Sequence, residues 1–258
     1  MPPLSLTGGA PACPKVSQPD LDGTQAFYDS GGLINDGDTF TVKLSPSIKP
    51  GTYSYMCLIH RGAMTAKVTV APPAQSIPSA SDQKAKGDQE FNQLQSQLKP
   101  VADAAKQPNG TTVKGGAGDP KLFNAIVTEF GPKDVSVPVG GSVTWDMFFF
   151  HTVSFGTSAA DVGIFTKAAD GTLQFSPKAL APAGVNVPAA AGEFPPPDNA
   201  SPLAISFGPY DGSGFESTGI LGSVPPQLIS VKASFPKAGT YTYRCLFHRD
   251  MEGTVKVG

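Results

Sequence analysis

The stretch "GTYTYRCLFHRDMEGTVKV" at residues 239–257 decides the fold of this chain. Its two ends, residues 239–244 and 252–257, alternate along the chain, which predicts two β-strands joined by a short loop. The loop carries Cys245, His248 and Met251. The stretch therefore predicts a hairpin that presents three side chains able to bind a metal ion.

The same pattern occurs a second time in the N-terminal part, as "GTYSYMCLIHRGAMTAKVTV" at residues 51–70. Here the loop residues are Cys57, His60 and Met64. Only three Cys, three His and five Met occur among the 258 residues, so chance is a poor explanation for two such loops. The longer segments 29–70 and 216–257 both predict strand, turn, strand, loop and strand. The sequence therefore predicts an internal duplication.

Two His nitrogens, a Cys thiolate and a distant Met thioether suit copper that alternates between Cu(I) and Cu(II). The C-terminal loop supplies one Cys, one His and one Met, so one further His would complete such a site. His151 follows the apolar strand "WDMFFF" and opens the segment "HTVSF", where a rigid sheet can hold it. We therefore expect one copper ion per chain, bound by His151, Cys245, His248 and Met251.

The N-terminal copy has no counterpart of His151, because the residues before Asp29 contain no His. Cys57, His60 and Met64 are therefore expected to form an incomplete second copper site. Two accounts stay open: the chain is the remainder of a longer protein, or the first copy is a structural partner that keeps the trio as packing. Half a β-sandwich exposes strand edges and an apolar face, so we expect a tight interdomain contact or a homo-oligomer.

The pattern "SVTWDMFFFHTVSF", followed far downstream by "GTYTYRCLFHRDMEGTVKV", resembles the cupredoxins, the plastocyanin, azurin and amicyanin group of blue copper proteins. The resemblance implies an all-β, Greek-key β-sandwich, complete in the C-terminal copy and partial in the N-terminal one. By position, it implies imidazole ligands at His151 and His248, a thiolate at Cys245 and an axial thioether at Met251. Some members carry Asn after the first His to tie the copper loop; Thr152 stands there in this chain and can make a similar bond.

The chain divides by composition into three parts. Residues 1–74 are the partial cupredoxin-like domain, residues 75–117 a Pro/Ser-rich and helical linker, and residues 118–258 the complete domain. A stretch rich in Ala, Pro and Gly, at about residues 156–208, is expected to be an insertion over one end of the sandwich.

A helix is predicted within the linker, because three apolar residues recur at helical spacing. They are Phe91, Leu94 and Leu98. Ser81 is the expected N-cap, and Pro100 is expected to end or kink the helix. The following "QPNGTTVKGGAGDP", residues 107–120, is expected to be a loop.

Composition excludes several classes of partner. The formal net charge is −2 and no basic stripe stands out, so nucleic acid is not an expected partner. No apolar run approaches the length of a membrane span.

The opening residues lack the basic segment and apolar core of a secretory signal, so a signal would have been removed or would lie upstream. Three Cys do not form a disulfide framework, although a Cys13–Cys57 bridge stays open.

The resemblance implies a protein that carries single electrons between redox protein partners in the periplasm or outside the cell. An enzyme such as a multicopper oxidase or copper nitrite reductase needs further His ligands, and three His cannot build such a centre within one chain. We therefore expect no enzymatic activity. The alternative is a copper handling or delivery protein, or a structural cupredoxin subunit of a larger assembly.

Overall fold

The computed structural model describes residues 18–30, 33, 37, 39–57, 64–119, 125–163, 165–167, 173–180, 203–223 and 229–258. It divides the chain into two compact units, which are described separately below. The first unit comprises residues 1–88 and 167–174, and the second comprises residues 89–166 and 175–258.

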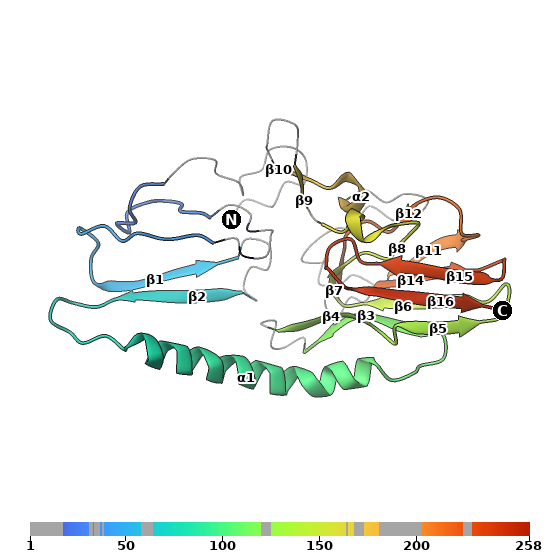
Figure 1. The fold of residues 1–258 in the computed structure, drawn as a ribbon, viewed down its shortest axis with the longest axis horizontal. Helices are drawn as coiled ribbons and strands as arrows, with labels where there is room; N and C mark the ends of the chain where they lie inside the picture. Colours follow the sequence, from blue (N-terminus) through green and yellow to red (C-terminus); the bar gives the residue numbers. More distant parts are fainter. Residues whose placement is uncertain are drawn as a thin grey trace. The chain divides into compact units, whose positions relative to one another are not determined.

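The second unit is built on two five-stranded sheets, whose strands lie beside one another in Figure 1. The first sheet has the order β11 (Leu203–Pro209), β14 (Ile229–Ser234), β6 (Ser142–Met147), β3 (Thr112–Gly118) and β4 (Ile126–Gly131). The other has the order β12 (Glu216–Ser217), β8 (Ser154–Phe155), β15 (Gly239–Arg244), β16 (Glu252–Val257) and β5 (Asp134–Val137). Shorter elements are β7 (Phe149–His151), β13 (Leu221–Ser223), η2 (Ala159–Asp161), β9 (Phe165–Lys167), β10 (Leu173–Phe175) and α2 (Pro177–Leu180).

The two sheets form a sandwich because alternate side chains of their strands share one core. Tyr241 and Tyr243 of β15 are buried, whereas Thr240 and Thr242, which alternate with them, are exposed. The Tyr243 ring contacts the Trp145 ring of β6 edge-on, at 5.1 Å between ring centroids. Burial of such alternating apolar side chains is the main stabilising term of a β-sandwich. The prediction of an all-β fold is confirmed.

Two segments that were not expected to be strands belong to this sandwich. Residues 112–118, expected to be a loop, form β3 and pair with both β4 and β6. The glycines of "KGGAG" led to the prediction of a loop, because Gly is depleted in strands and is typical of turns. The end of the expected insertion, residues 203–209, forms β11 and pairs in parallel with β14.

The predicted linker helix exists as α1 (Ala80–Ala105); its expected N-cap is wrong, and Pro100 does not end it. Its N-cap is Ser79 and not Ser81, because the Ser79 hydroxyl accepts the Asp82 backbone N–H at 3.1 Å. The Asp82 carboxylate in turn accepts the Ser79 N–H at 3.1 Å, which completes a capping box. Pro100 lies inside the helix, which continues to Ala105. None of the described helices is long and apolar enough to cross a membrane.

The described residues of the first unit include one hairpin, β1 (Gly51–Met56) with β2 (Thr65–Val70). Residues 39–44, "TFTVKL", are the first strand that the pattern of segment 29–70 predicts, and they form only an isolated parallel bridge, between Leu21 and Leu44. The register of the hairpin runs from Gly51 opposite Val70 to Met56 opposite Thr65. The hairpin of β15 and β16 has the same length and the same pairing pattern.

Candidate metal centre

The ligand loop of the second unit joins two strands that end side by side. Arg244 of β15 pairs with Glu252 of β16, and the loop between them holds Cys245, His248 and Met251. The Cys245 N–H donates to the Met251 carbonyl at 2.9 Å, which closes the loop. The hairpin therefore fixes the backbone positions of the Cys and the Met relative to each other.

His151 approaches this loop from another part of the chain. It ends β7, where it pairs with Leu221 of β13, and its side chain is fully buried. Its Nδ1 lies 3.8 Å from the Cys245 Sγ and 3.0 Å from the His248 Nδ1. The Cys245 Sγ lies 3.7 Å from the His248 Nδ1. Three of the four ligands expected from the sequence therefore converge on one point.

The donor set fits a single soft or borderline metal ion. Ligand bonds of about 2.0–2.3 Å to nitrogen and sulfur bring the donors of one ion to within about 4 Å of one another. The three measured separations lie in this range. Met251 follows in the same loop and is 1% exposed. Thiolate, two imidazoles and a nearby thioether are the set that copper prefers over zinc or magnesium.

Burial controls the protonation of this cluster. It holds the pKa of His151 well below its usual range, with a further contribution from the neighbouring His248 and a partial offset from the Phe148 backbone. Burial also raises the pKa of the Cys245 thiol, although hydrogen bonds from Thr152, Phe247 and His248 act against it. His151 is therefore neutral at pH 7, the form that binds a metal ion.

Thr152 ties the two halves of the cluster together. Its backbone N–H donates to the Cys245 Sγ at 3.4 Å, and its hydroxyl accepts the Leu246 N–H at 2.8 Å. The Ser154 hydroxyl donates to the same Thr152 oxygen at 3.0 Å and is itself 2.7 Å from the Ser217 hydroxyl. All these hydroxyls are buried, so the bond expected of Thr152 exists and extends into a chain of side chains that the sequence did not reveal.

A glycine-rich strand makes room for the His151 ring. A Cβ at Gly116 of β3 would lie 2.3 Å from the His151 Nε2. Gly116 also has a φ of +81°, which other residues rarely adopt. Sequence reasoning missed this residue because it took the segment for a loop. The run "GGAG" is the sequence feature that could have indicated Gly116, since Gly within a strand often marks a position that another group approaches closely.

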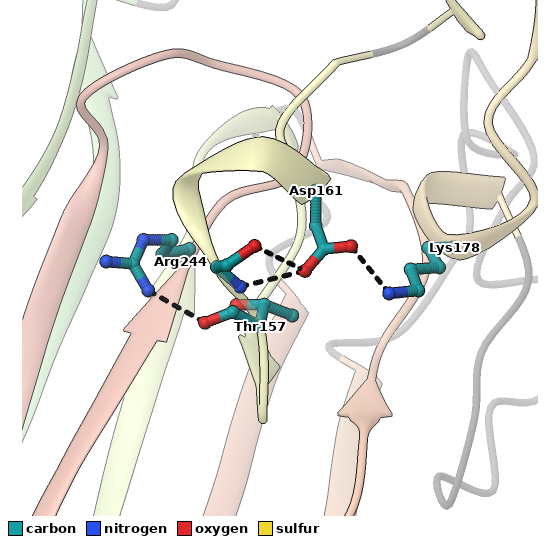
Figure 2. Close-up of polar contacts among 5 residues, drawn as sticks. Thr157, Asp161, Lys178 and Arg244 are labelled. Atoms are coloured by element: carbon teal, nitrogen blue, oxygen red, sulfur yellow. Dashed lines mark hydrogen bonds and ion pairs between the residues drawn. The ribbon is translucent and has the colours of Figure 1, made fainter.

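The segment after β8, residues 156–163, forms hydrogen bonds with the strand that leads to Cys245. Figure 2 shows the Arg244 guanidinium donating to the Thr157 carbonyl, at 2.9 Å. Asp161 accepts the Ser158 N–H and pairs with Lys178 of α2. The Lys178 bond is the first cause that keeps the pKa of the Asp161 carboxyl below its usual range. Gly163 then donates its N–H to the Leu246 carbonyl at 3.0 Å, so this segment contacts the ligand loop directly.

The first unit repeats the loop closure but not the cluster. The Cys57 N–H donates to the Met64 carbonyl at 2.9 Å, as in the C-terminal loop. Cys57 is half-buried, and Met64 is 59% exposed, against 1% for Met251. His60 and Cys13 lie outside the described residues. The second copper site expected from the sequence therefore stays a prediction.

Comparison with known proteins gives a family match over part of the chain and several matching solved structures. Residues 16–71 match the family described as copper binding proteins, plastocyanin/azurin family. No curated protein sequence is significantly similar to the chain. A purple cupredoxin from Nitrosopumilus maritimus is 15% identical over 57% of this chain and 99% of that chain, with a TM-score of 0.26. A copper-containing nitrite reductase from Thermus scotoductus SA-01 is 16% identical over 59% of this chain and 23% of that chain, with a TM-score of 0.27. A reduced auracyanin from Roseiflexus castenholzii is 18% identical over 50% of this chain and 87% of that chain, with a TM-score of 0.26.

The family match covers the N-terminal copy, and the convergent donors lie in the C-terminal one. The two copies share a hairpin register and a Cys-to-Met loop closure. Residues 16–71 are therefore similar to the plastocyanin/azurin family of copper-binding proteins, and the C-terminal sandwich holds a His, Cys and His cluster suited to copper.

Proposed function

We propose that this chain carries single electrons between redox protein partners, using one type 1 copper ion bound by His151, Cys245, His248 and Met251. The observation that carries the proposal is the convergence of two Nδ1 atoms and one Sγ, 3.0–3.8 Å apart, on a buried point of a rigid sandwich. Copper bound there supplies a one-electron couple between Cu(I) and Cu(II).

The protein's part is to hold the ligands in one arrangement for both oxidation states. Each ligand is fixed by an element that does not depend on the metal: His151 by the pairing of β7 with β13, and Cys245 and Met251 by the hairpin. Thr152 adds the hydrogen bonds that join the two. Little rearrangement on a change of oxidation state allows fast electron transfer.

His248 is the ligand through which electrons would leave. His151 and Cys245 are fully buried, whereas His248 is only partly buried. The Phe247 ring lies 4.9 Å from the His248 ring and 6.5 Å from the Phe150 ring, between ring centroids. This aromatic group offers an apolar surface to a redox protein partner, which we expect in the periplasm or outside the cell.

Voltammetry and turnover assays on the copper-loaded full chain test this function. We expect one reversible one-electron wave and repeated reduction by ascorbate and reoxidation without loss of signal. We expect no steady reduction of nitrite and no oxygen consumption with phenols, because three His leave no ligands for a further copper centre. Steady turnover in either assay, by the chain alone, would contradict the proposal in favour of an enzyme.

A further inference from the structure

Four hydroxyl side chains are buried beside the metal centre, in the interior of the sandwich. Thr152, Ser154 and Ser217 are fully buried, and Thr218 is 2% exposed. Burying a hydroxyl costs free energy unless it is hydrogen-bonded, so the contacts of these four groups can all be traced. Ser217 of β12 lies directly opposite Ser154 of β8 in the register of the two strands. The strand pairing therefore brings two of these hydroxyls together.

The direction of their hydrogen bonds follows from the number of protons, because each hydroxyl has only one to donate. Ser154 donates its proton to the Thr152 oxygen at 3.0 Å. The Ser154 and Ser217 oxygens are 2.7 Å apart, so the proton of this second bond comes from Ser217. The Ser217 oxygen in turn accepts the Gly219 N–H at 3.1 Å. A hydroxyl chain therefore runs from Ser217 through Ser154 to Thr152, with each member donating to the next.

Thr152 is the point at which the hydroxyl chain reaches the metal donors. Its oxygen accepts both the Ser154 hydroxyl and the Leu246 N–H, which occupies its two lone pairs. Its own proton therefore points to another acceptor, and its backbone N–H already lies 3.4 Å from the Cys245 Sγ. Burial raises the pKa of the Cys245 thiol, and a hydrogen bond from the Thr152 side chain acts against that rise. The last hydroxyl of the chain thus donates to the Cys245 sulfur.

We propose that Ser154 and Ser217 are positioning residues for the Cys245 ligand: they order the hydroxyl protons so that Thr152 donates to the sulfur, and they thereby raise the reduction potential of the copper centre. This inference rests on the proposed function, because it concerns copper bound at that sulfur. A hydrogen bond draws electron density from a thiolate, which then stabilises Cu(II) less, so the potential rises. Each donor in a chain also polarises and strengthens the next one. The two serines therefore act on the centre through Thr152.

Voltammetry and visible spectra of the copper-loaded full chain test this role. Ser217→Ala and Ser154→Ala should each lower the reduction potential, with an equilibrium constant for reduction about two- to threefold smaller than in wild type, the scale on which one hydrogen bond strengthens the next. Their thiolate-to-copper band should shift to longer wavelength, because the sulfur holds its electrons less tightly. Ser217→Thr retains the hydroxyl and should recover the potential and the band of wild type.

Thr218→Val is the matched control, because Thr218 adjoins Ser217 but does not belong to the hydroxyl chain. Its hydroxyl accepts the Val153 N–H at 3.0 Å and donates to the Gly219 carbonyl at 2.7 Å. Thr218→Val should lower the free energy of unfolding and leave the potential and the band as in wild type. Equal shifts of the potential in Thr218→Val and Ser217→Ala would overturn the inference, because a general loosening of this segment would explain both. An unchanged potential in both Ala variants would overturn it as well.

NMR of the copper-free full chain tests the direction of the hydroxyl chain without the metal. The Thr152 hydroxyl proton should show nuclear Overhauser contacts to the Cys245 β-protons, and the Ser217 hydroxyl proton to the Ser154 β-protons. A Thr152 proton that lies against the Ser154 side chain instead would reverse the chain and overturn the inference. A wild type without a thiolate-to-copper band in Cu(II) would contradict the proposed function, and with it the effect on the potential, whatever direction NMR finds for the chain.

Discussion

At the scale of single residues, Thr152 connects the protein scaffold to the proposed metal ligands. It stands directly after His151 and hydrogen-bonds both to the Cys245 sulfur and to the loop residue Leu246. The buried hydroxyls of Ser154 and Ser217 hold its side chain in place. A buried group with several partners is costly to remove, because each partner is then left without a hydrogen bond.

Replacing Thr152 by Val is therefore expected to destabilise the copper-free protein by about 1–3 kcal/mol, the usual cost of leaving buried donors unpaired. The Leu246 amide should exchange its hydrogen faster with solvent. Thr152→Ser retains the hydroxyl and should recover most of both properties. Denaturant unfolding and amide exchange measure the effects. Equal losses in the Val and Ser variants would show that the methyl packing, and not the hydroxyl, matters.

Gly116 gives a second prediction at this scale. Gly116→Ala should displace the His151 ring, because the new Cβ would lie 2.3 Å from its Nε2. Copper affinity should fall by at least an order of magnitude, as is usual when a ligand's support is lost. Gly140→Ala is the matched control: Gly140 has a φ of +80°, like Gly116 at +81°, but nothing lies within 4 Å of its Cβ. Equal copper affinities in the two variants, by competitive titration, would contradict the steric argument.

At the scale of elements, a short acidic turn supports the hairpin before Cys245. In the second unit, Asp211 accepts the Ser213 N–H and pairs with Lys237, while Tyr241 donates to the Lys237 carbonyl. The first unit has a similar turn, in which Asp22 accepts the Thr24 N–H at 2.8 Å. In the second unit the Asp211–Lys237 pair therefore joins the turn to the start of the hairpin.

Asp211→Asn tests this turn through pH. The hydrogen bonds from Lys237 and then Ser213 lower the pKa of Asp211 from its ordinary value of 3.8. A carboxyl with a lowered pKa stabilises the fold above pH 3.8 and loses that effect as the pH falls below it. Wild type should melt at a higher temperature than the Asn variant at pH 7, and the difference should vanish in acid. A difference that persists in acid would assign the effect to something other than the charge.

The sequence predicted the elements with regular alternation and the ligands in close spacing. The sequence was sufficient to predict the hairpins, the β-strands around Trp145 and the convergence of His151 with the Cys loop. Period-two alternation and ligand chemistry are local signals, so they can be recognised in the sequence. β3 was missed because its glycines serve the packing around His151, a tertiary contact. The sequence left open whether Pro100 ends or kinks the helix, because a Pro removes one helix hydrogen bond and its ring clashes with the preceding turn; in the structure α1 continues past Pro100.

At the scale of the whole molecule, the two units differ in their buried cores and in the metal donors that they bring together. The second unit buries a complete core and brings the donors of one metal centre together. The first unit keeps the loop closure of the copper hairpin but exposes the residues that would be its core. A single working copper centre per chain, in the second unit, is therefore the organisation that we propose.

The most direct test of that account is the visible spectrum and metal content of the protein with Cu(II), for wild type and for Cys245→Ser. Wild type should bind one copper ion per chain and show an intense thiolate-to-copper band that ascorbate bleaches. Cys245→Ser should lose the band and retain its β-sheet circular dichroism, because the sandwich core does not need the metal. A band that survives in Cys245→Ser, or two coppers per chain in wild type, would contradict a single centre built on Cys245.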